Sequence, residues 1–152
     1  MRLSSAGLEL LRKSEGFRNQ AYRDVTGVAT IGYGHRLLPG ESFPGGLDQP
    51  QAEELLMSDV RHAEDAVGRL VRVPLTQGQF DALVDFVFNL GAGRLAASTL
   101  LIDLNAERYD IAAEQLLRWD HAGGSEVAGL KVRREAEFQL WSGIETHGQA
   151  AA

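Results

Sequence analysis

The stretch SEGFRNQAYRDVTGVATIGYGH, Ser14–His35, decides the fold because its pattern changes from helical to strand-like. Upstream of it, leucines spaced for one helical face lead to Glu15, and Gly16 ends that pattern. Beyond Gly16, the short runs AYRD and ATIGYG flank the turn VTGV, in which Gly27 can adopt a positive φ. We therefore predict a short N-terminal helix followed by a β-hairpin over Ala21–Gly34.

The rest of the chain has a helical pattern. A loop that holds three of the four prolines covers 35–50, and an amphipathic helix follows over Gln51–Leu70. At about 1.5 Å per residue this helix would span roughly 30 Å, enough to bridge two lobes. A strongly apolar segment that ends at Gly91 predicts the core helix. The predicted N-caps are Ser4 or Ser5, Asp48 and Thr76, and the remaining helices are expected over Ser98–Glu107, Asp110–Trp119 and Leu130–Trp141, with the glycine-rich loop HAGGSEVAG between the last two.

Length and composition restrict the function classes. The chain has 152 residues, 44% of them hydrophobic, which suits one compact domain over residues 1–152. It contains no cysteine, so disulfides, thiolate zinc sites and thiol nucleophiles are excluded. Its net charge is −6, and no run approaches the roughly 20 apolar residues that a membrane helix needs, so neither nucleic acid nor a stable membrane association is expected.

Asp24 and Thr30 are the first candidates for chemistry. With Gly27 at the centre of the hairpin, these two residues lie directly opposite each other, with Cβ atoms about 5 Å apart. A carboxylate can take a proton from a water molecule that a threonine hydroxyl orients. The alternative is structural, because an aspartate often stabilises a turn and a threonine is an ordinary strand residue.

Glu15 adds a second carboxyl. It ends the apolar face of the first helix, so we expect its side chain to be partly buried where helix and hairpin meet, and burial favours the protonated acid. A protonated Glu that faces an ionised Asp is the pair that glycoside hydrolysis needs: one group protonates the leaving oxygen, and the other serves the water or the sugar cation. Alternatively, Glu15 is a helix-end residue that pairs with Arg12 or Arg18.

The stretch Ser14–His35 resembles the N-terminal signature of the phage lysozymes, the endolysins of glycoside hydrolase family 24. The catalytic triad of that family is Glu, Asp and Thr, and its spacing of nine and then six residues is matched by Glu15, Asp24 and Thr30. The resemblance continues with QFDALVDFVFNLG, Gln79–Gly91, and GLKVRREAEFQLW, Gly129–Trp141. It implies an α+β, lysozyme-like, mainly helical fold, with a small β-hairpin lobe over about 15–50, a connecting helix over about 51–70, and a larger helical lobe over about 74–143 that includes the N-terminal helix.

The resemblance implies an enzyme without cofactor or metal. Its members are muramidases, which hydrolyse the β-1,4 bond between N-acetylmuramic acid and N-acetylglucosamine in bacterial peptidoglycan. It implies Glu15 as the general acid, Asp24 as the group that activates the water or supports the oxocarbenium-like centre, and Thr30 as the group that positions the water. Inversion at the anomeric carbon requires carboxyl groups roughly 6.5 to 9.5 Å apart, with room for water between them.

The resemblance also implies supporting residues. In this family an arginine on the last helix pairs with the catalytic Glu, and Arg133 is the better match, with the adjacent Arg134 as the alternative. Such a pair favours the charged carboxylate, against the effect of burial. Asn89 matches a cleft residue at the end of the core helix. Residues that could line the sugar groove are Tyr22, Tyr33 and Gly34, although residues of these types are more often structural.

Histidines and glycine motifs indicate no further chemistry. His35 follows GYG and has the residue type of a general base or a metal ligand, but the resemblance implies a structural histidine paired with an acid. His62, His121 and His147 show no metal-ligand spacing, so no metal is expected. The GYG stretch lacks the third glycine and the following helix of a dinucleotide loop, and neither GxxxxGK nor GxSxG occurs, so nucleotide binding and serine hydrolysis are not expected.

The family also suggests a route to the substrate. The sequence has neither the signal-arrest-release segment nor the regulatory cysteines of some of these endolysins. We therefore expect a monomer that folds in the host cytoplasm and reaches the periplasmic peptidoglycan after a holin opens the membrane, without touching the holin. No separate wall-binding module is expected.

Two rival functions can be named. A lytic transglycosylase forms a 1,6-anhydro product without water, and the presence of Asp24 and Thr30 argues against it because that chemistry needs no water site. A catalytically inactive lysozyme-like domain would bind glycan or form part of a virion. The presence of both Glu15 and Asp24 argues against this second rival.

Overall fold

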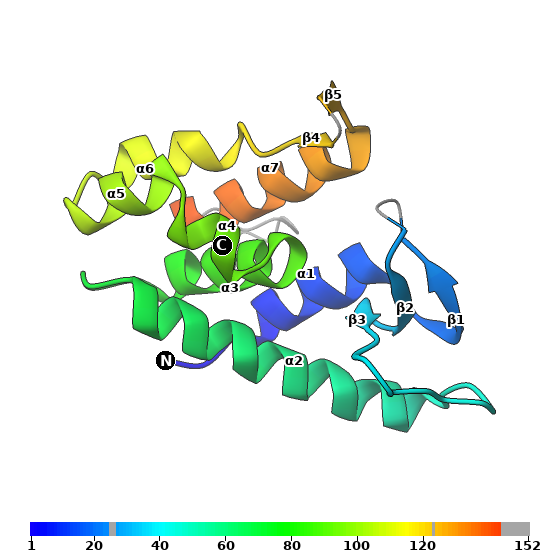
Figure 1. Cartoon of the computed structure of the whole chain (residues 1–152). Coiled ribbons are helices and arrows are strands. Elements are labelled where there is room, and N and C mark those ends of the chain that lie inside the picture. Colours follow the sequence, from blue (N-terminus) through cyan, green and yellow to red (C-terminus); the bar gives the residue numbers. More distant parts are fainter. Residues whose placement is uncertain (25–26, 123, 144–152) are drawn as a thin grey trace, which may run out of the picture.

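The computed structural model describes residues 1–24, 27–122 and 124–143, which form seven helices and two small antiparallel sheets. A three-stranded sheet lies at one end of the molecule and α5 and α6 lie at the other, with α2 running between them (Figure 1). The helices are α1 (Ser5–Glu15), α2 (Gln49–Leu70), α3 (Gln77–Leu90), α4 (Ala92–Ala96), α5 (Thr99–Asn105), α6 (Tyr109–Leu116) and α7 (Ala128–Ser142). The strands are β1 (Arg18–Arg23), β2 (Ala29–Gly32) and β3 (His35–Arg36) in one sheet, in that order, and β4 (His121–Ala122) and β5 (Ser125–Glu126) in the other.

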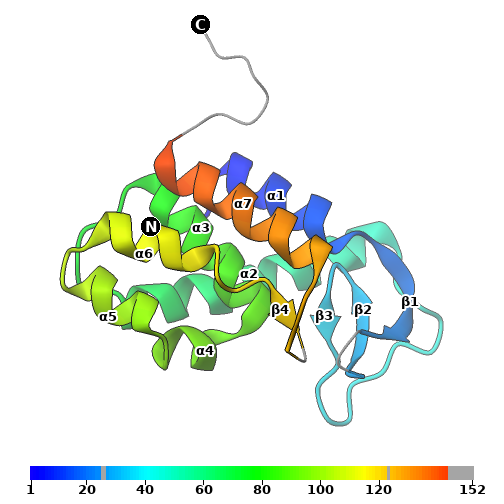
Figure 2. The ribbon, with the colours of Figure 1, turned by 90° about the horizontal axis from the view of Figure 1, so that it is seen from above.

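Helix α3 is the central helix of the fold. It packs against α1, α2, α4 and α7, and the view from above shows α1 and α7 side by side along it (Figure 2). Phe80, Leu83 and Phe86 of α3 are buried, together with nearly all of its middle turns. The prediction of a core helix that ends at Gly91 is therefore confirmed.

The apolar interior consists of two clusters that α2 connects. Leu56 and Val60 of α2 belong to the cluster beside the three-stranded sheet, whereas Ala63 and Val67, one to two turns further on, belong to the larger cluster among the helices. The long helix therefore joins the two parts of the interior, as predicted. Charged residues recur along it, and none of the described helices is both long enough and apolar enough to cross a membrane.

The three predicted N-caps are confirmed because each depends on local side-chain chemistry, although α2 begins at Gln49, two residues before the predicted Gln51. Ser4, and not Ser5, caps α1 and accepts a hydrogen bond from a backbone N–H one turn later. Asp48 and Thr76 each form a capping box, in which the cap side chain accepts from the backbone of Gln51 or Gln79 and that glutamine returns a bond to the cap residue. These reciprocal bonds satisfy two of the four free N–H groups at each helix start.

Several short elements differ from the prediction. Helix α4 was not expected, strand β3 lies inside the stretch 35–50 that was predicted as a loop, and the glycine-rich stretch holds the β4–β5 hairpin. Helix α6 ends at Leu116 instead of Trp119, and α7 begins at Ala128 instead of Leu130. Segments of two to five residues are too short to show a periodicity in the sequence. The short strands β3, β4 and β5 form by pairing with a neighbouring strand.

The β1–β2 hairpin has a different register from the predicted one. Thr30 pairs with Tyr22, so the turn is centred one residue earlier than Gly27. Asp24 causes the difference: its carbonyl accepts from Gly27 N at 2.9 Å and its carboxylate accepts from Val28 N at 3.0 Å, a role that aspartate favours at the first position of a turn. The prediction that Asp24 and Thr30 are directly opposed is therefore wrong. They are diagonal neighbours on the same face of the ladder.

Candidate active site

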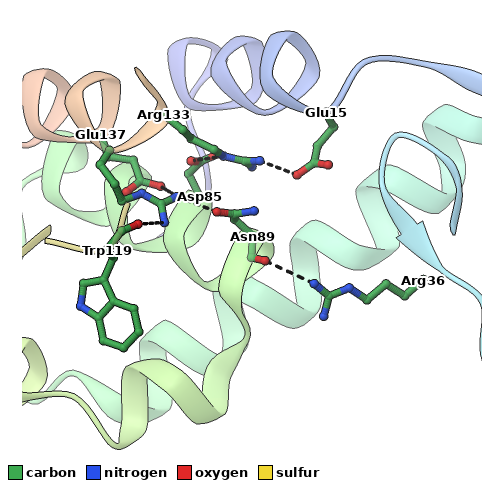
Figure 3. A network of polar contacts seen from close by, with 8 residues as sticks. Glu15, Arg36, Asp85, Asn89, Trp119, Arg133 and Glu137 are labelled. Carbon is green, nitrogen blue, oxygen red and sulfur yellow. Dashed lines mark hydrogen bonds and ion pairs between the residues drawn. The ribbon is translucent and has the colours of Figure 1, made fainter. Parts of the chain in front are cut away.

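Glu15 lies where the helical part of the molecule meets the sheet. It is the last residue of α1, and its side chain is 16% exposed. Arg133 of α7 donates from Nη1 to Glu15 Oε2 at 2.6 Å (Figure 3). The structure thus places Arg133, and not Arg134, against the acid that the sequence singled out.

Gly34 forms the other wall of the Glu15 site. A Cβ built on Gly34 would lie 2.8 Å from Glu15 Cδ and closer still to Oε1, and the φ of Gly34 is +72°. Only glycine combines this backbone conformation with so close an approach of the carboxyl. Gly34 also lines a hollow of about 450 Å³ that lies between β3, α2 and the C-terminal half of α3.

Two of the candidate carboxylates affect the Tyr22 hydroxyl. Burial and the charge of Glu15 raise the pKa of Tyr22, Arg18 opposes this, and Asp24 adds to it. Arg18 also stacks over the Tyr22 ring, 4.5 Å from its centroid.

Thr30 is buried, and its hydroxyl has a fixed orientation. Its side chain donates from Oγ1 to the carbonyl of Val28 at 2.9 Å, and the residue is 2% exposed. With its proton used in this bond, the hydroxyl oxygen presents only lone pairs to any other partner. Thr30 can therefore only accept a hydrogen bond from a further partner.

Tyr33 and Asn89, two of the predicted supporting residues, contact other residues of the protein. Tyr33 is 6% exposed, its ring packs 5.6 Å from that of Phe17, and its hydroxyl accepts from Gln49 at 3.1 Å. It therefore supports the sheet from inside. Asn89 is half-buried at the end of α3, where its side-chain oxygen accepts from Arg134 at 2.8 Å and its carbonyl accepts from Arg36 at 3.4 Å (Figure 3).

Arg133 is itself held by a carboxylate that the sequence analysis missed. Its Nε and Nη2 donate to the two oxygens of Asp85, both at 2.9 Å, and the Asp85 side chain is fully buried. Burial alone would raise the pKa of Asp85, but the charge of Arg133 and the neighbouring Glu137 carboxyl hold it below its usual value. Arg133 thus bridges Asp85 and Glu15 with three N–H groups.

Arg134 and Glu137 complete this polar region inside the helices. Arg134 donates from Nη2 to Glu137 Oε2 at 2.8 Å, and both side chains are fully buried. The Arg134 guanidinium lies over the Phe86 ring, 5.3 Å from its centroid. The sequence held one signal for Asp85: it interrupts the otherwise apolar run ALVDFVF, and a charge in such a run requires a buried partner.

His35 is a structural histidine, as the resemblance implied. It is buried, with Nδ1 2.7 Å from Asp59 of α2 and Nε2 2.8 Å from Glu41. The hydrogen bond with Asp59, opposed by burial and supported by Glu41, raises the pKa of His35 to about 9. The charged imidazole therefore ties β3 to α2 beside the hollow. His147 lies outside the described residues, within which no group of three or more His, Asp and Glu side chains is arranged to hold a metal ion.

The His35 clamp predicts a specific dependence of stability on pH. The folded-state pKa of about 9 exceeds the ordinary value of 6.5, so the stabilisation is complete below pH 6.5 and is lost as the pH rises through 9. Because Asp59 and Glu41 are 25% and 26% exposed, solvent screens the pair, and we expect a loss on the order of 1–3 kcal/mol. Urea unfolding at a series of pH values measures it.

A pair of variants separates the effect of His35 on the unfolding free energy from the effects of other groups that titrate in the same pH range. His35→Gln should flatten the decline in unfolding free energy over this pH window. His62→Gln, which changes an exposed histidine of α2, should leave the decline as it is in the unmodified protein. An equal decline in all three proteins would show that His35 does not cause it.

Comparison with known proteins assigns most of the chain to one family. Residues 12–137 match the phage lysozyme family. The endolysin of Salmonella phage P22 is 43% identical over 137 residues, which cover 88% of this chain and 94% of that protein. The endolysin of Bacillus phage B103 is 42% identical over 144 residues, 93% of this chain, but the chain spans only 54% of that relative's length.

A solved structure agrees with the fold. The muramidase domain of SpmX from Asticaccaulis excentricus matches with a TM-score of 0.81 at 36% sequence identity. The match covers 92% of this chain and 97% of that one. The predicted α+β, lysozyme-like and mainly helical fold is therefore confirmed.

Proposed function

The chain belongs to the phage lysozyme family, and from this premise we propose that it is an endolysin, a muramidase that cuts the β-1,4 bond between N-acetylmuramic acid and N-acetylglucosamine in host peptidoglycan. The observation that carries the proposal is the placement of Glu15, whose carboxyl is held between Arg133 and Gly34 where the sheet meets the helices. Relatives named endolysin and a muramidase-domain structure support the same activity.

In the proposed reaction Glu15 is the general acid. It transfers its proton to the glycosidic oxygen as the bond to the anomeric carbon breaks, and the ring develops oxocarbenium character. Arg133 holds one carboxyl oxygen, Oε2, and leaves Oε1 on the side of Gly34. A sugar that covers the exposed 16% of the side chain would exclude water from it, which favours the neutral acid that can donate.

Asp24 and Thr30 act on the water that replaces the leaving group. The Asp24 carboxylate takes one proton from the water, and the lone pairs of Thr30 Oγ1 accept a hydrogen bond from the other, so the water oxygen faces the anomeric carbon. Attack from the face opposite the leaving group gives an inverted product. The carboxyl separation required for inversion, roughly 6.5 to 9.5 Å, leaves room for this water.

Replacement of Thr30 tests the water site. Thr30→Val keeps the volume but removes the acceptor, and we expect kcat to fall by about tenfold to a hundredfold with little change in KM. Thr30→Ser keeps the hydroxyl and should retain most of the activity. Steady-state kinetics on soluble murein fragments would measure both variants, and equal activity of Thr30→Val and the unmodified enzyme would remove Thr30 from the mechanism.

Product analysis tests the function itself. Purified Gram-negative murein is digested in ¹⁸O-labelled water, and the fragments are analysed by mass spectrometry. Reducing N-acetylmuramic acid ends that carry ¹⁸O establish hydrolysis, and the first-formed anomer, read by NMR, gives the stereochemical course. Unlabelled 1,6-anhydro ends would identify a transglycosylase, and no cleavage by folded protein would favour a glycan-binding domain.

The route to the substrate is also part of the proposal. We infer that the protein accumulates in the host cytoplasm, reaches the periplasm when a holin permeabilises the membrane, and acts there as a monomer on peptidoglycan. The net charge of −6 supports this, because it gives no attraction to the anionic cell envelope. Co-expression with and without a holin, with lysis followed by turbidity, tests the dependence on release.

A further inference from the structure

Asp85 and Glu137 form a buried acid pair between α3 and α7. Both side chains have no exposed surface, and their carboxyl groups lie within hydrogen-bonding reach of each other. Two ionised carboxylates in such a position would repel strongly, because little solvent screens them. The pair therefore requires a proton or a compensating arrangement of positive charge.

Hydrogen-bond geometry places that proton on Glu137. Asp85 uses both of its oxygens to accept from Arg133, whereas Glu137 accepts at Oε2 from Arg134 and has no donor at Oε1. A proton on Oε1 would supply a donor for Asp85 and satisfy the last oxygen of the pair. No other atom of the pair needs a donor.

Charge balance also requires one proton in this region while Glu15 is ionised. The groups that face the pair are Arg133 and Arg134 from α7 and, through Arg133, Glu15 from α1. If all of these groups are ionised, three carboxylates oppose two guanidinium groups, and one negative charge is left without compensation, although only Asp85 and Glu137 are fully buried. One proton makes the region neutral. Burial, reinforced by the hydrogen bond with Asp85, raises the pKa of Glu137 well above its usual range.

We propose that Glu137 is held as a neutral acid that donates to Asp85, and that the pair is a positioning device for Glu15 in the reaction. The hydrogen bond from Glu137 fixes the Asp85 carboxylate, which in turn binds Nε and Nη2 of Arg133. Because a guanidinium group is planar and rigid, two bonds on one edge set the direction of Nη1, which holds Glu15 Oε2. The positioning role rests on the proposed function, whereas the protonation of Glu137 does not.

The protonation state can be measured without any substrate. Protein labelled with ¹³C at the glutamate carboxyls is titrated by NMR, and the Glu137 signal is identified by its loss in Glu137→Gln. We expect a shift typical of a carboxylic acid throughout the range from pH 5 to about 8, in which surface glutamates are ionised. A carboxylate shift for Glu137 over that range would overturn the proposal.

Two isosteric variants test the positioning role. The amide introduced by Glu137→Gln would still donate to Asp85 and accept from Arg134, so we expect kcat within about threefold of the unmodified enzyme. Asp85→Asn cannot accept both Arg133 bonds, so Nη1 loses its fixed direction and kcat should fall by about tenfold or more with KM unchanged. Glu135→Gln makes the same chemical change as Glu137→Gln on the exposed face of α7 and serves as control.

The outcomes separate the proposals. A loss of kcat in Glu137→Gln as large as in Asp85→Asn would mean that Glu137 works as a carboxylate, and unchanged kinetics in folded Asp85→Asn would mean that Asp85 does not position Glu15. An unmodified enzyme that cleaves no murein would refute the proposed function, while the NMR titration would still decide whether Glu137 carries the proton.

Discussion

A Glu15→Gln variant should lose at least about a thousandfold in murein hydrolysis while remaining folded. Glutamine keeps the volume and can still accept a hydrogen bond from Arg133 Nη1, but it has no proton to give to the glycosidic oxygen. The rest of the site does not depend on the Glu15 charge, because Arg133 keeps its two bonds to Asp85. The decrease in turbidity of a murein suspension measures the loss.

Stability and a control variant complete this test. The unfolding free energy of Glu15→Gln should stay within about 1 kcal/mol of the unmodified protein, because Glu15 is partly exposed and replacement of active-site groups rarely costs stability. Glu9→Gln makes the same change on the exposed face of α1, and its activity should be unaffected. Normal turnover in Glu15→Gln would rule out Glu15 as the acid, and a large loss in Glu9→Gln would indicate a general effect of charge.

The parts of the fold that could be predicted are those that depend on residues close in sequence. Ser4, Asp48 and Thr76 cap helices through bonds that reach at most three residues ahead, so a short stretch of sequence suffices to predict them. The apolar periodicity of α2 and α3 likewise requires only one segment. For the same reason, the N-terminal motif placed Glu15 correctly at the end of its helix.

The parts that could not be predicted depend on distant partners or on competing local bonds. The hairpin register failed because Asp24 accepts from Val28 N, and this bond moves the turn away from the position that Gly27 alone would favour. Glu137 looked like an ordinary charged position on its helix, and the position of Asp85 in an apolar run indicated burial but not its partner. Their role follows only from the packing of α3 against α7, which brings them and Arg133 together.

Three segments far apart in sequence meet at the Glu15 carboxyl. Helix α1 carries it, the turn between β2 and β3 contributes Gly34, and α7 contributes Arg133, which is 118 residues away. Both partners of Glu15 are held in place: Gly34 contacts it through the backbone, and the Arg133 side chain is bound by Asp85. The site is therefore rigid on both sides, and a small intrusion on either side must displace the acid.

Gly34→Ala is such an intrusion, and we expect it to reduce kcat by about a hundredfold. The added methyl group would overlap Glu15, whose carboxyl is the movable partner, so the side chain must rotate and weaken its bond to Arg133. Since only the end of a side chain shifts, the steric cost to folding is small. The positive φ of Gly34 adds strain of about 1–2 kcal/mol, as for any non-glycine residue in that conformation.

Gly40→Ala separates the two effects. Gly40 has a φ of +81°, similar to that of Gly34, but a Cβ there meets no atom within 4 Å. Its alanine variant should therefore show a comparable loss of unfolding free energy in urea and normal hydrolysis. If both variants lost activity equally, backbone strain and not displacement of Glu15 would be the cause. If Gly34→Ala kept full activity, the carboxyl would have to work from a rotated position, and the arrangement of Glu15 between Gly34 and Arg133 would not be the catalytic one.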